Sequence, residues 1–256
     1  MNILLTNDDG INSVGVVKLA EALRQKKHRV ILLAPDVDRS GISNALSIFS
    51  GPVKIVPKGV DTWSCSGYPA DCVYIGPRLV SPLRIDLMIS GINLGENLGT
   101  DIVYSGTASA ARQASLLGYE AIALSLAADD GCHWDMAVSW AANNLEHLFA
   151  YCTKDTFLNV NIPNSPKGPE GIIATWPAPK KYKDSLQEMT TKNGRRYFML
   201  ETDGCEGDYE PGSDCDVVSR NYVSVSTVYN FPVVIREFCP GAPVFAAVSK
   251  RDYDRE

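Results

Sequence analysis

The sequence predicts an α/β protein in which a mostly parallel, Rossmann-like sheet carries helices on both faces and a hairpin-bearing lobe follows towards the C-terminus. Two patterns support this fold class. Apolar runs alternate with amphipathic stretches along the first half of the chain, which is typical of strands joined by helices. The composition then shifts towards Pro, Gly, Lys and Asp after about residue 163, where only short strand candidates occur.

The strands and helices of the first half follow from periodicity and end signals. In the stretch 14–26, Val16, Leu19 and Leu23 fall on one helical face, opposite charged residues. Ser105 precedes, and Gly118 follows, an Ala- and Leu-rich stretch, as expected for a helix with defined ends. Expected strands span residues 3–6, 30–34, 85–90 and 121–126, and expected helices span 14–26, 107–117 and 135–149.

The second half continues the sheet and then leaves it. Residues 157–162 alternate apolar and polar side chains, which predicts a strand with one wetter face. Strand candidates at 171–176 and 196–201 belong to the expected lobe, and 223–228 returns to the core. We therefore expect a single domain over 1–256: a core of about 1–163, a lobe of about 164–219, and a return segment with a tail over 220–256.

Charge and composition exclude several functional classes. The net charge of −6 and the absence of a basic run argue against binding polymeric nucleic acid. The first residues show neither a charged leader nor a long apolar stretch, so no membrane association is expected. Seven cysteines without a Cys-x-x-Cys pair favour the cytoplasm over an oxidising compartment.

Polar residues follow three predicted strands and suggest a metal site. Asp8 and Asp9 come after the first strand, Ser40 after the second, and Asn93 after the third. Strand ends of open α/β sheets are where ligands bind, and two adjacent carboxylates resist ionisation together unless a cation neutralises them. Oxygen ligands favour Mg²⁺ or Mn²⁺, with Ca²⁺ as a substitute, over Zn²⁺. Taken alone, the loop of residues 7–10 is better explained as a plain polar turn, and the other two loops could be such turns as well; their occurrence at three successive strand ends favours a site.

A fourth polar segment suggests a phosphate site. Ser105 and Gly106 precede, and Thr107 begins, the helix predicted over 107–117, where backbone amides and the helix dipole attract anions. A simple Ser or Thr cap would account for the same residues. The chain has no Gly-x-x-x-x-Gly-Lys-Ser/Thr loop, so nothing supports triphosphate binding of the Walker type.

Four segments in this order resemble the stationary-phase survival protein SurE family of metal-dependent 5'/3'-nucleotidases. They are residues 3–10, 34–41, 90–93 and 104–107, which read ILLTNDDG, APDVDRSG, SGIN and YSGT. Looser similarity continues through PADCV at 69–73, NVNIP at 159–163 and YVSV at 222–225. The resemblance implies a Rossmann-like core and dimers or tetramers joined through exchanged C-terminal segments.

The resemblance also implies roles for single residues. Asp8, Asp9, Ser40 and Asn93 would hold the metal, with Asp8 or Asp9 orienting the attacking water. Those expected to surround the phosphate are Asn97, Ser105, Gly106 and Thr107. The chain departs from the family at Tyr229, where many members have a histidine.

The metal and phosphate motifs predict a phosphomonoesterase, and the resemblance implies that it is metal-dependent, hydrolyses nucleoside 5'- and 3'-monophosphates and forms a homodimer or homotetramer. One alternative is a nucleotide-binding or regulatory module without turnover, with Tyr229 as the relevant change. Another is a nucleotide-sugar glycosyltransferase, which the chain length and the missing glycine pattern oppose. A covalent Asp8 nucleophile is disfavoured because phosphatases of that type use Asp-x-Asp.

Overall fold

The computed structural model describes residues 1–128, 131–205 and 209–232, and within them the predicted α/β class is confirmed. Nine strands form one sheet in the order β3-β4-β2-β1-β5-β6-β7-β11-β8, and the pairings from β4 through β7 are all parallel. The strands are β1 Asn2–Thr6, β2 Arg29–Pro35, β3 Ile55–Gly59, β4 Thr62–Cys65, β5 Leu87–Leu94, β6 Ala121–Ala127, β7 Thr156–Pro163, β8 Ile172–Thr175 and β11 Val223–Tyr229.

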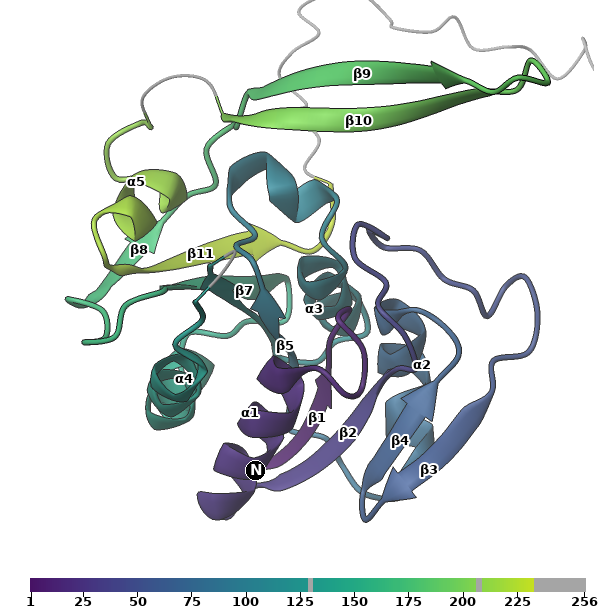
Figure 1. Cartoon of the computed structure of the whole chain (residues 1–256). Helices are drawn as coiled ribbons and strands as arrows, with labels where there is room; N and C mark the ends of the chain where they lie inside the picture. Colours follow the sequence, from purple (N-terminus) through teal and green to yellow (C-terminus); the bar gives the residue numbers. More distant parts are fainter. Residues whose placement is uncertain (129–130, 206–208, 233–256) are drawn as a thin grey trace, which may run out of the picture.

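Helices cover both faces of this sheet (Figure 1). On one face α1 and α4 pack side by side, and on the other α2 packs against α3. None of the described helices is long and apolar enough to cross a membrane. The helices are α1 Val14–Gln25, α2 Pro69–Leu79, α3 Gly106–Leu116, α4 Trp134–Phe149 and α5 Asp214–Ser219, with the 3₁₀ turn η1 Gly99–Val103.

The core explains why the central strands read as continuous apolar runs. Ile3, Leu4 and Leu5 are fully buried, because successive residues of β1 face the two helix layers in turn. On α1 the expected apolar face, with Val16, Leu19 and Leu23, is buried against the sheet. Because β1, β2 and β5 run parallel, their carboxyl ends lie at one edge of the sheet, where the loops that follow them meet.

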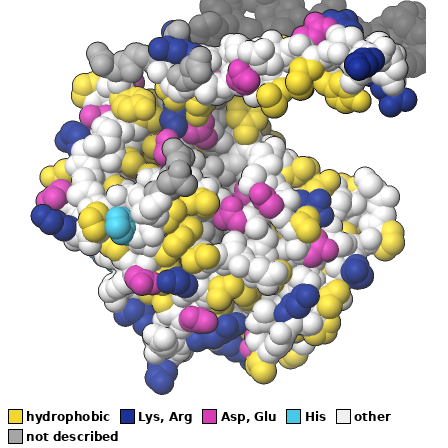
Figure 2. Space-filling model, viewed as in Figure 1, with side chains coloured by type: hydrophobic (Ala, Val, Ile, Leu, Met, Phe, Trp, Pro, Cys, Tyr) yellow, Lys and Arg dark blue, Asp and Glu magenta, His cyan; other side chains and the backbone are white. Residues whose placement is uncertain are grey.

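The hairpin of β9 Tyr182–Thr190 and β10 Arg196–Cys205 stands apart from the main sheet. Figure 1 shows it lying across one side of the molecule, and in Figure 2 it projects beyond a hollow, with hydrophobic side chains along its underside. Leu186, Phe198 and Leu200 are each more than half exposed. By contrast, β8 pairs with β11 in the main sheet, so the projecting part of the expected lobe is this hairpin.

The structure differs from the sequence predictions at several elements. The strand expected to end at Ser90 continues to Leu94, so Asn93 lies within β5 and not in a loop after it. Helix α2 and the edge hairpin β3–β4 were not predicted, and neither was β9, whose side chains are nearly all exposed and carry no clear alternation. The end of the tail, 233–256, lies outside the described residues.

Candidate active site

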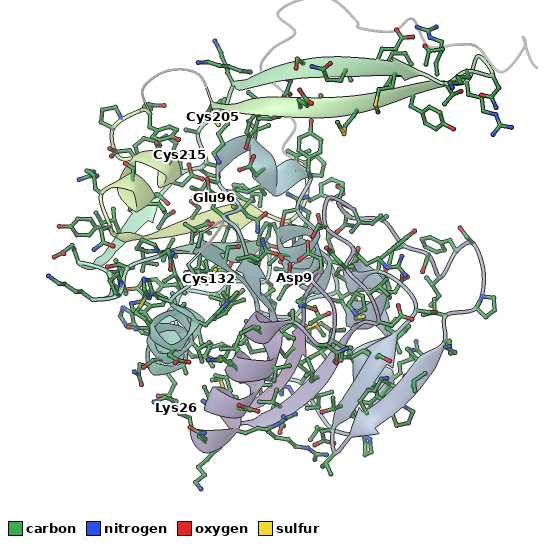
Figure 3. All side chains as sticks on the ribbon, viewed as in Figure 1. Asp9, Lys26, Glu96, Cys132, Cys205 and Cys215 are labelled. Atoms are coloured by element: carbon green, nitrogen blue, oxygen red, sulfur yellow. The ribbon has the colours of Figure 1, made fainter. Side chains whose placement is uncertain are left out.

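Most of the predicted site residues line one cavity at the carboxyl ends of β1, β2 and β5. The cavity measures about 220 Å³. The side-chain view in Figure 3 places Asp9 at this edge of the sheet, and Glu96 lies on the loop that follows β5. The residues that line the cavity are Asp8, Ser40, Gly41, Asn93, Leu94, Asn97, Asp101, Tyr104 and Ser105.

The remaining predicted residues contact side chains or backbone of residues that line this cavity. Asp9 accepts a hydrogen bond from the backbone N–H of Leu94 through Oδ2 (3.3 Å). The hydroxyl of Thr107 donates to Asp8 Oδ1, and Gly106 lies against the same carboxylate. The structure therefore brings all the predicted metal and phosphate residues into one neighbourhood, although Asp9, Gly106 and Thr107 do not line the cavity itself.

Both aspartates are held where ionisation is unfavourable. Burial raises the pKa of Asp8, against which the hydrogen bond from Thr107 acts. Burial, and then the charge of Asp8, raise the pKa of Asp9 to about 7. A cation between them would remove this penalty, because a positive charge favours the ionised form of both groups.

Ser40 and Asn93 are oriented by their neighbours. Asp38 Oδ1 accepts from both the N–H and the hydroxyl of Ser40 (2.8 and 2.7 Å). The side-chain NH₂ of Asn93 donates to the carbonyls of Leu94 and Gly95 (3.1 and 2.9 Å), so its Oδ1 is the atom left to coordinate a cation. The neighbours thus leave a hydroxyl oxygen and an amide oxygen available beside the two carboxylates.

This donor set fits a hard divalent cation. Among the described residues, no three His, Cys, Asp or Glu side chains gather in a way that could hold a metal, so the carboxylates would need Ser40 and Asn93 as partners. Two carboxylate oxygens, a hydroxyl and an amide match the preference of Mg²⁺ or Mn²⁺, which usually retain water as further ligands.

An irregularity in β5 sets the position of Asn93. Pairing with β6 shifts register between Ser90 and Asn93, and Gly91 between them has φ of +130°. A Cβ on Gly91 would lie 2.2 Å from the carbonyl oxygen of Leu124. Only glycine fits here, so the Ser-Gly-Ile-Asn motif encodes a bulge that re-aims the strand end.

Asn97 is fixed by buried polar residues that the sequence analysis did not assign to the site. Asn161 receives the N–H of Asn97 at Oδ1 (2.8 Å) and donates to its carbonyl (3.2 Å). Asn159 donates to the same carbonyl (2.8 Å), and the Asn97 side chain donates to Ser125 (2.8 Å). The expected wetter face of 157–162 is wrong, because Asn159 and Asn161 are fully buried. The only sequence signal for these two asparagines was the NVNIP segment at 159–163, which resembles the family.

The start of α3 is partly occupied by the protein's own groups. Ser105 caps the helix by accepting from the N–H of Ala108 (3.0 Å). A Cβ on Gly106 would lie 2.7 Å from both Cβ and Oδ2 of Asp8. The absence of a side chain at Gly106 is therefore required for the close approach of Asp8 to the start of α3.

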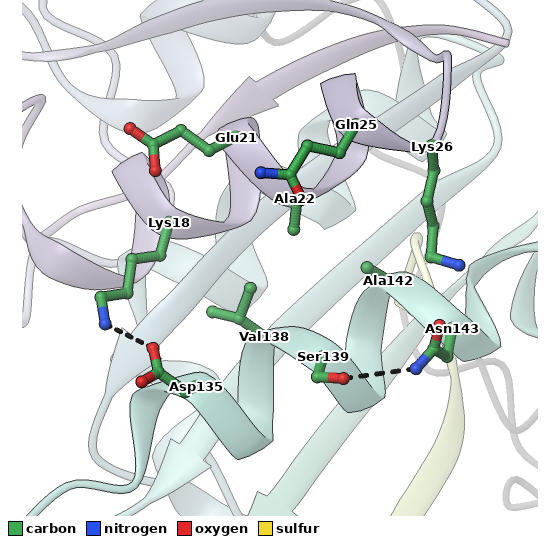
Figure 4. A pocket seen from close by; sticks show the side chains of 10 residues that line it. All are labelled: Lys18, Glu21, Ala22, Gln25, Lys26, Asp135, Val138, Ser139, Ala142 and Asn143. Atoms are coloured by element: carbon green, nitrogen blue, oxygen red, sulfur yellow. Dashed lines mark hydrogen bonds and ion pairs between the residues drawn. The ribbon is translucent and has the colours of Figure 1, made fainter.

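Other features lie away from this cavity. His28 lies between α1 and β2, and His133 and His147 belong to α4 and its cap, so none lines the cavity. Tyr229 ends β11 and is 64% exposed. A larger groove of about 430 Å³ between α1 and α4 is shown in Figure 4, but none of the predicted site residues line it.

The family is decided by comparison with known proteins. The model of the family described as survival protein SurE matches residues 3–184. The chain belongs to the SurE family.

Relatives extend the match beyond residue 184. The 5'-nucleotidase SurE of Pseudothermotoga lettingae is 37% identical over 242 residues, covering 90% of each chain. The 5'-nucleotidase SurE of Kosmotoga olearia is 36% identical, covering 90% of this chain and 93% of its own. The crystal structure of the SurE protein from Aquifex aeolicus superposes with a TM-score of 0.81 at 33% identity, covering 91% of this chain and 95% of that one.

Proposed function

We propose that this SurE-family chain is a metal-dependent phosphomonoesterase that hydrolyses nucleoside 5'- and 3'-monophosphates to nucleoside and phosphate. Relatives that match over nine-tenths of the chain are 5'-nucleotidases. The observation that carries the proposal is the cavity that gathers Asp8, Ser40 and Asn93 with Asn97 and Ser105. Oxygen donors for a cation and polar groups for an anion within one cavity suit a phosphate ester.

Asp8, Asp9, Ser40 and Asn93 would hold the metal. When bound, the cation would supply positive charge against the phosphate oxygens and lower the pKa of a water molecule. The raised pKa values of Asp8 and Asp9 support this assignment, since the two carboxylates gain most from a neighbouring cation.

The chain's own groups would bind and align the ester. Asn97 and Ser105 line the cavity and would contact phosphate oxygens, and the first amides of α3 would favour the charge that develops there. Asp8 or Asp9 would orient the attacking water. The water oxygen would bond to phosphorus as the bond from phosphorus to the ribose oxygen breaks. The ribose oxygen would leave on the nucleoside and take up a proton, which balances the proton that the attacking water gives up.

The decisive experiment measures phosphate release from a panel of nucleoside 5'- and 3'-monophosphates and an aryl phosphate. Chelation with EDTA is expected to abolish turnover and added Mg²⁺ or Mn²⁺ to restore it, because two buried carboxylates would otherwise face the phosphate dianion. The highest kcat/KM is expected on nucleotides. Nucleotide binding without turnover under every metal would replace the proposal with the binding-module alternative and direct attention to Tyr229.

We also propose that the chain forms a homodimer or homotetramer in which the β9–β10 hairpin contacts another copy. Both faces of this hairpin expose large apolar side chains, each about half exposed or more. They are Met189, Tyr197 and Met199 on one face and Leu186, Phe198 and Leu200 on the other. This is an unusual amount of apolar surface for a two-stranded ribbon. Light scattering at working concentration should give a multiple of 27.8 kDa. A monomer would contradict this proposal.

A further inference from the structure

The segment that joins the two proposed phosphate-binding residues is the turn η1. It runs between Asn97 and Ser105, and its Asp101 lines the cavity. The Ser105 N–H donates to the carbonyl of Asp101 (2.9 Å). A displacement of η1 would therefore move Ser105, whereas Asn97 is held separately by Asn159, Asn161 and Ser125.

The chain leading into the hairpin holds this turn in place. The N–H of Lys180 donates to the hydroxyl of Thr100 (2.9 Å), which donates back to the Lys180 carbonyl (3.3 Å). A Cβ on Gly99 would lie 1.9 Å from the carbonyl oxygen of Ala178, so the two backbones are in direct contact. Buried Asp214 accepts from the N–H groups of both Gly99 and Ala178 (2.7 and 3.1 Å).

The side chain of Lys180 reaches from this segment to two carboxylates beside the cavity. Its Nζ lies 2.7 Å from Asp101 Oδ2 and 3.1 Å from Glu96 Oε1, and only 4% of the side chain is exposed. Tyr182 donates a further hydrogen bond to Asp101 Oδ1. Burial alone would lower the pKa of Lys180, but the hydrogen bond to Asp101 and the charges of Glu96 and Asp101 raise it.

A positive charge such as that of Lys180 is needed beside the cavity to offset the carboxylates that line it. The residues that line it include Asp8 and Asp101 but no Lys or Arg. A phosphate dianion entering here meets carboxylates, and the charge of Asp101 acts on it directly unless a cation compensates. Lys180 lies behind Asp101 as that cation, and burial keeps solvent from screening the pair strongly.

We propose that Lys180 is a positioning residue that offsets the charge of Asp101 beside the cavity, with Glu96 as its second partner, and thereby sets the affinity of the site for the phosphate group. The proposal rests on the proposed function, since it takes Asn97 and Ser105 as phosphate contacts. It makes the base of the hairpin part of the site, although residues 178–182 belong to no motif of the sequence analysis. Lys180 acts through Asp101 and η1 and does not touch the reacting atoms.

The test replaces Lys180 by Met, which keeps the length of the stem and removes the charge. We expect KM for a nucleoside monophosphate to rise about tenfold, and kcat to stay within roughly twofold, because an uncompensated carboxylate opposes the ground state and the transition state alike. Binding of inorganic phosphate to the metal-loaded protein, measured by calorimetry, should weaken by about tenfold for the same electrostatic reason.

Three further variants separate charge from structure. Lys180→Arg keeps the charge and should restore KM. The double variant Lys180→Met with Asp101→Asn removes the opposing charge and should recover most of the lost affinity, as a coupled pair requires. Lys183→Met alters an exposed lysine of β9 nearby and should behave like the wild type.

The outcomes separate this inference from the proposed function. A wild type without nucleotide turnover would overturn the proposed function, while phosphate calorimetry would still test Lys180. If Lys180→Met leaves both KM and phosphate affinity unchanged in an active enzyme, the inference is wrong. It is also wrong if the variant lowers kcat and thermal stability together and Asp101→Asn brings no recovery, because Lys180 would then serve only the fold.

Discussion

Asp8→Asn and Asp9→Asn are each expected to lower kcat for phosphate release by about 10³-fold while leaving the fold intact. Each variant replaces a charged metal ligand with a neutral group of nearly the same shape. Asn at position 8 can still accept from the hydroxyl of Thr107, and Asn at position 9 can still accept from the N–H of Leu94. The measurement is kcat at saturating Mg²⁺ or Mn²⁺ beside metal affinity by calorimetry.

A surface carboxylate provides the matched control. Asp135 at the start of α4 is almost fully exposed and pairs with Lys18. Asp135→Asn should change neither kcat nor metal affinity, because exposed ion pairs contribute little. Near-normal turnover by either Asp8→Asn or Asp9→Asn, with the metal requirement kept, would refute the assignment of these aspartates.

The buried carboxylate of Asp9 should also make the stability of the metal-free protein depend on pH. The pKa of Asp9 is about 7 in the folded protein against an ordinary value of 3.8, so the unfolded chain loses this proton first as the pH rises. Metal-free wild type should lose stability between about pH 4 and 7, whereas Asp9→Asn should lose less. Thermal unfolding in EDTA across this range checks both curves.

The cavity was largely predictable because its residues stand at strand ends. The sheet class fixes where those ends meet, and the side chains of Asp8, Ser40 and Asn93 then have one place to converge. The exact geometry of Asn93 was not predictable from the apolar run alone. It depends on a bulge at Gly91 that is visible only as a shift in pairing with β6.

Other parts escaped prediction because local pattern and tertiary role disagree. Asn159 and Asn161 look like the solvent side of a strand, yet both are buried where they hold the backbone of Asn97. Lys180 lies in a stretch rich in Pro and Lys that indicates a loop, although its side chain is buried between two acids. Partners distant along the chain decide such roles, and periodicity does not report them.

Helix α2 was missed for a related reason. It begins at Pro69 and contains Pro77, both of which argue against a helix when the sequence is scanned locally. The first proline stands in the first turn, where it is tolerated, and Asp71 accepts from the backbone N–H of Tyr68 (2.8 Å), which satisfies an amide at the start of the helix.

Gly106→Ala is expected to lower kcat/KM by about 10²-fold, although it adds only one methyl group. The new Cβ would lie 2.7 Å from Cβ and Oδ2 of Asp8, closer than packed atoms come. Asp8 has little room to yield, because the N–H of Arg39 donates to its carbonyl (2.8 Å) and the hydroxyl of Thr107 to its carboxylate. The carboxylate must therefore shift relative to Ser40 and Asn93, and metal affinity measured by calorimetry should fall with activity.

Two other glycines separate this local effect from general overpacking. A Cβ on Gly76 would meet the Leu4 side chain at 2.6 Å, so Gly76→Ala, like Gly106→Ala, should lower the free energy of unfolding by roughly 1–3 kcal/mol. Its contact lies in the core between α2 and β1, away from the cavity, and the folded variant should keep its metal affinity. Gly51→Ala meets no atom within 4 Å and should change neither property. If Gly106→Ala matched Gly76→Ala in losing stability but not metal affinity, the glycine would serve packing alone, and the position of Asp8 would depend on its bonds to Arg39 and Thr107.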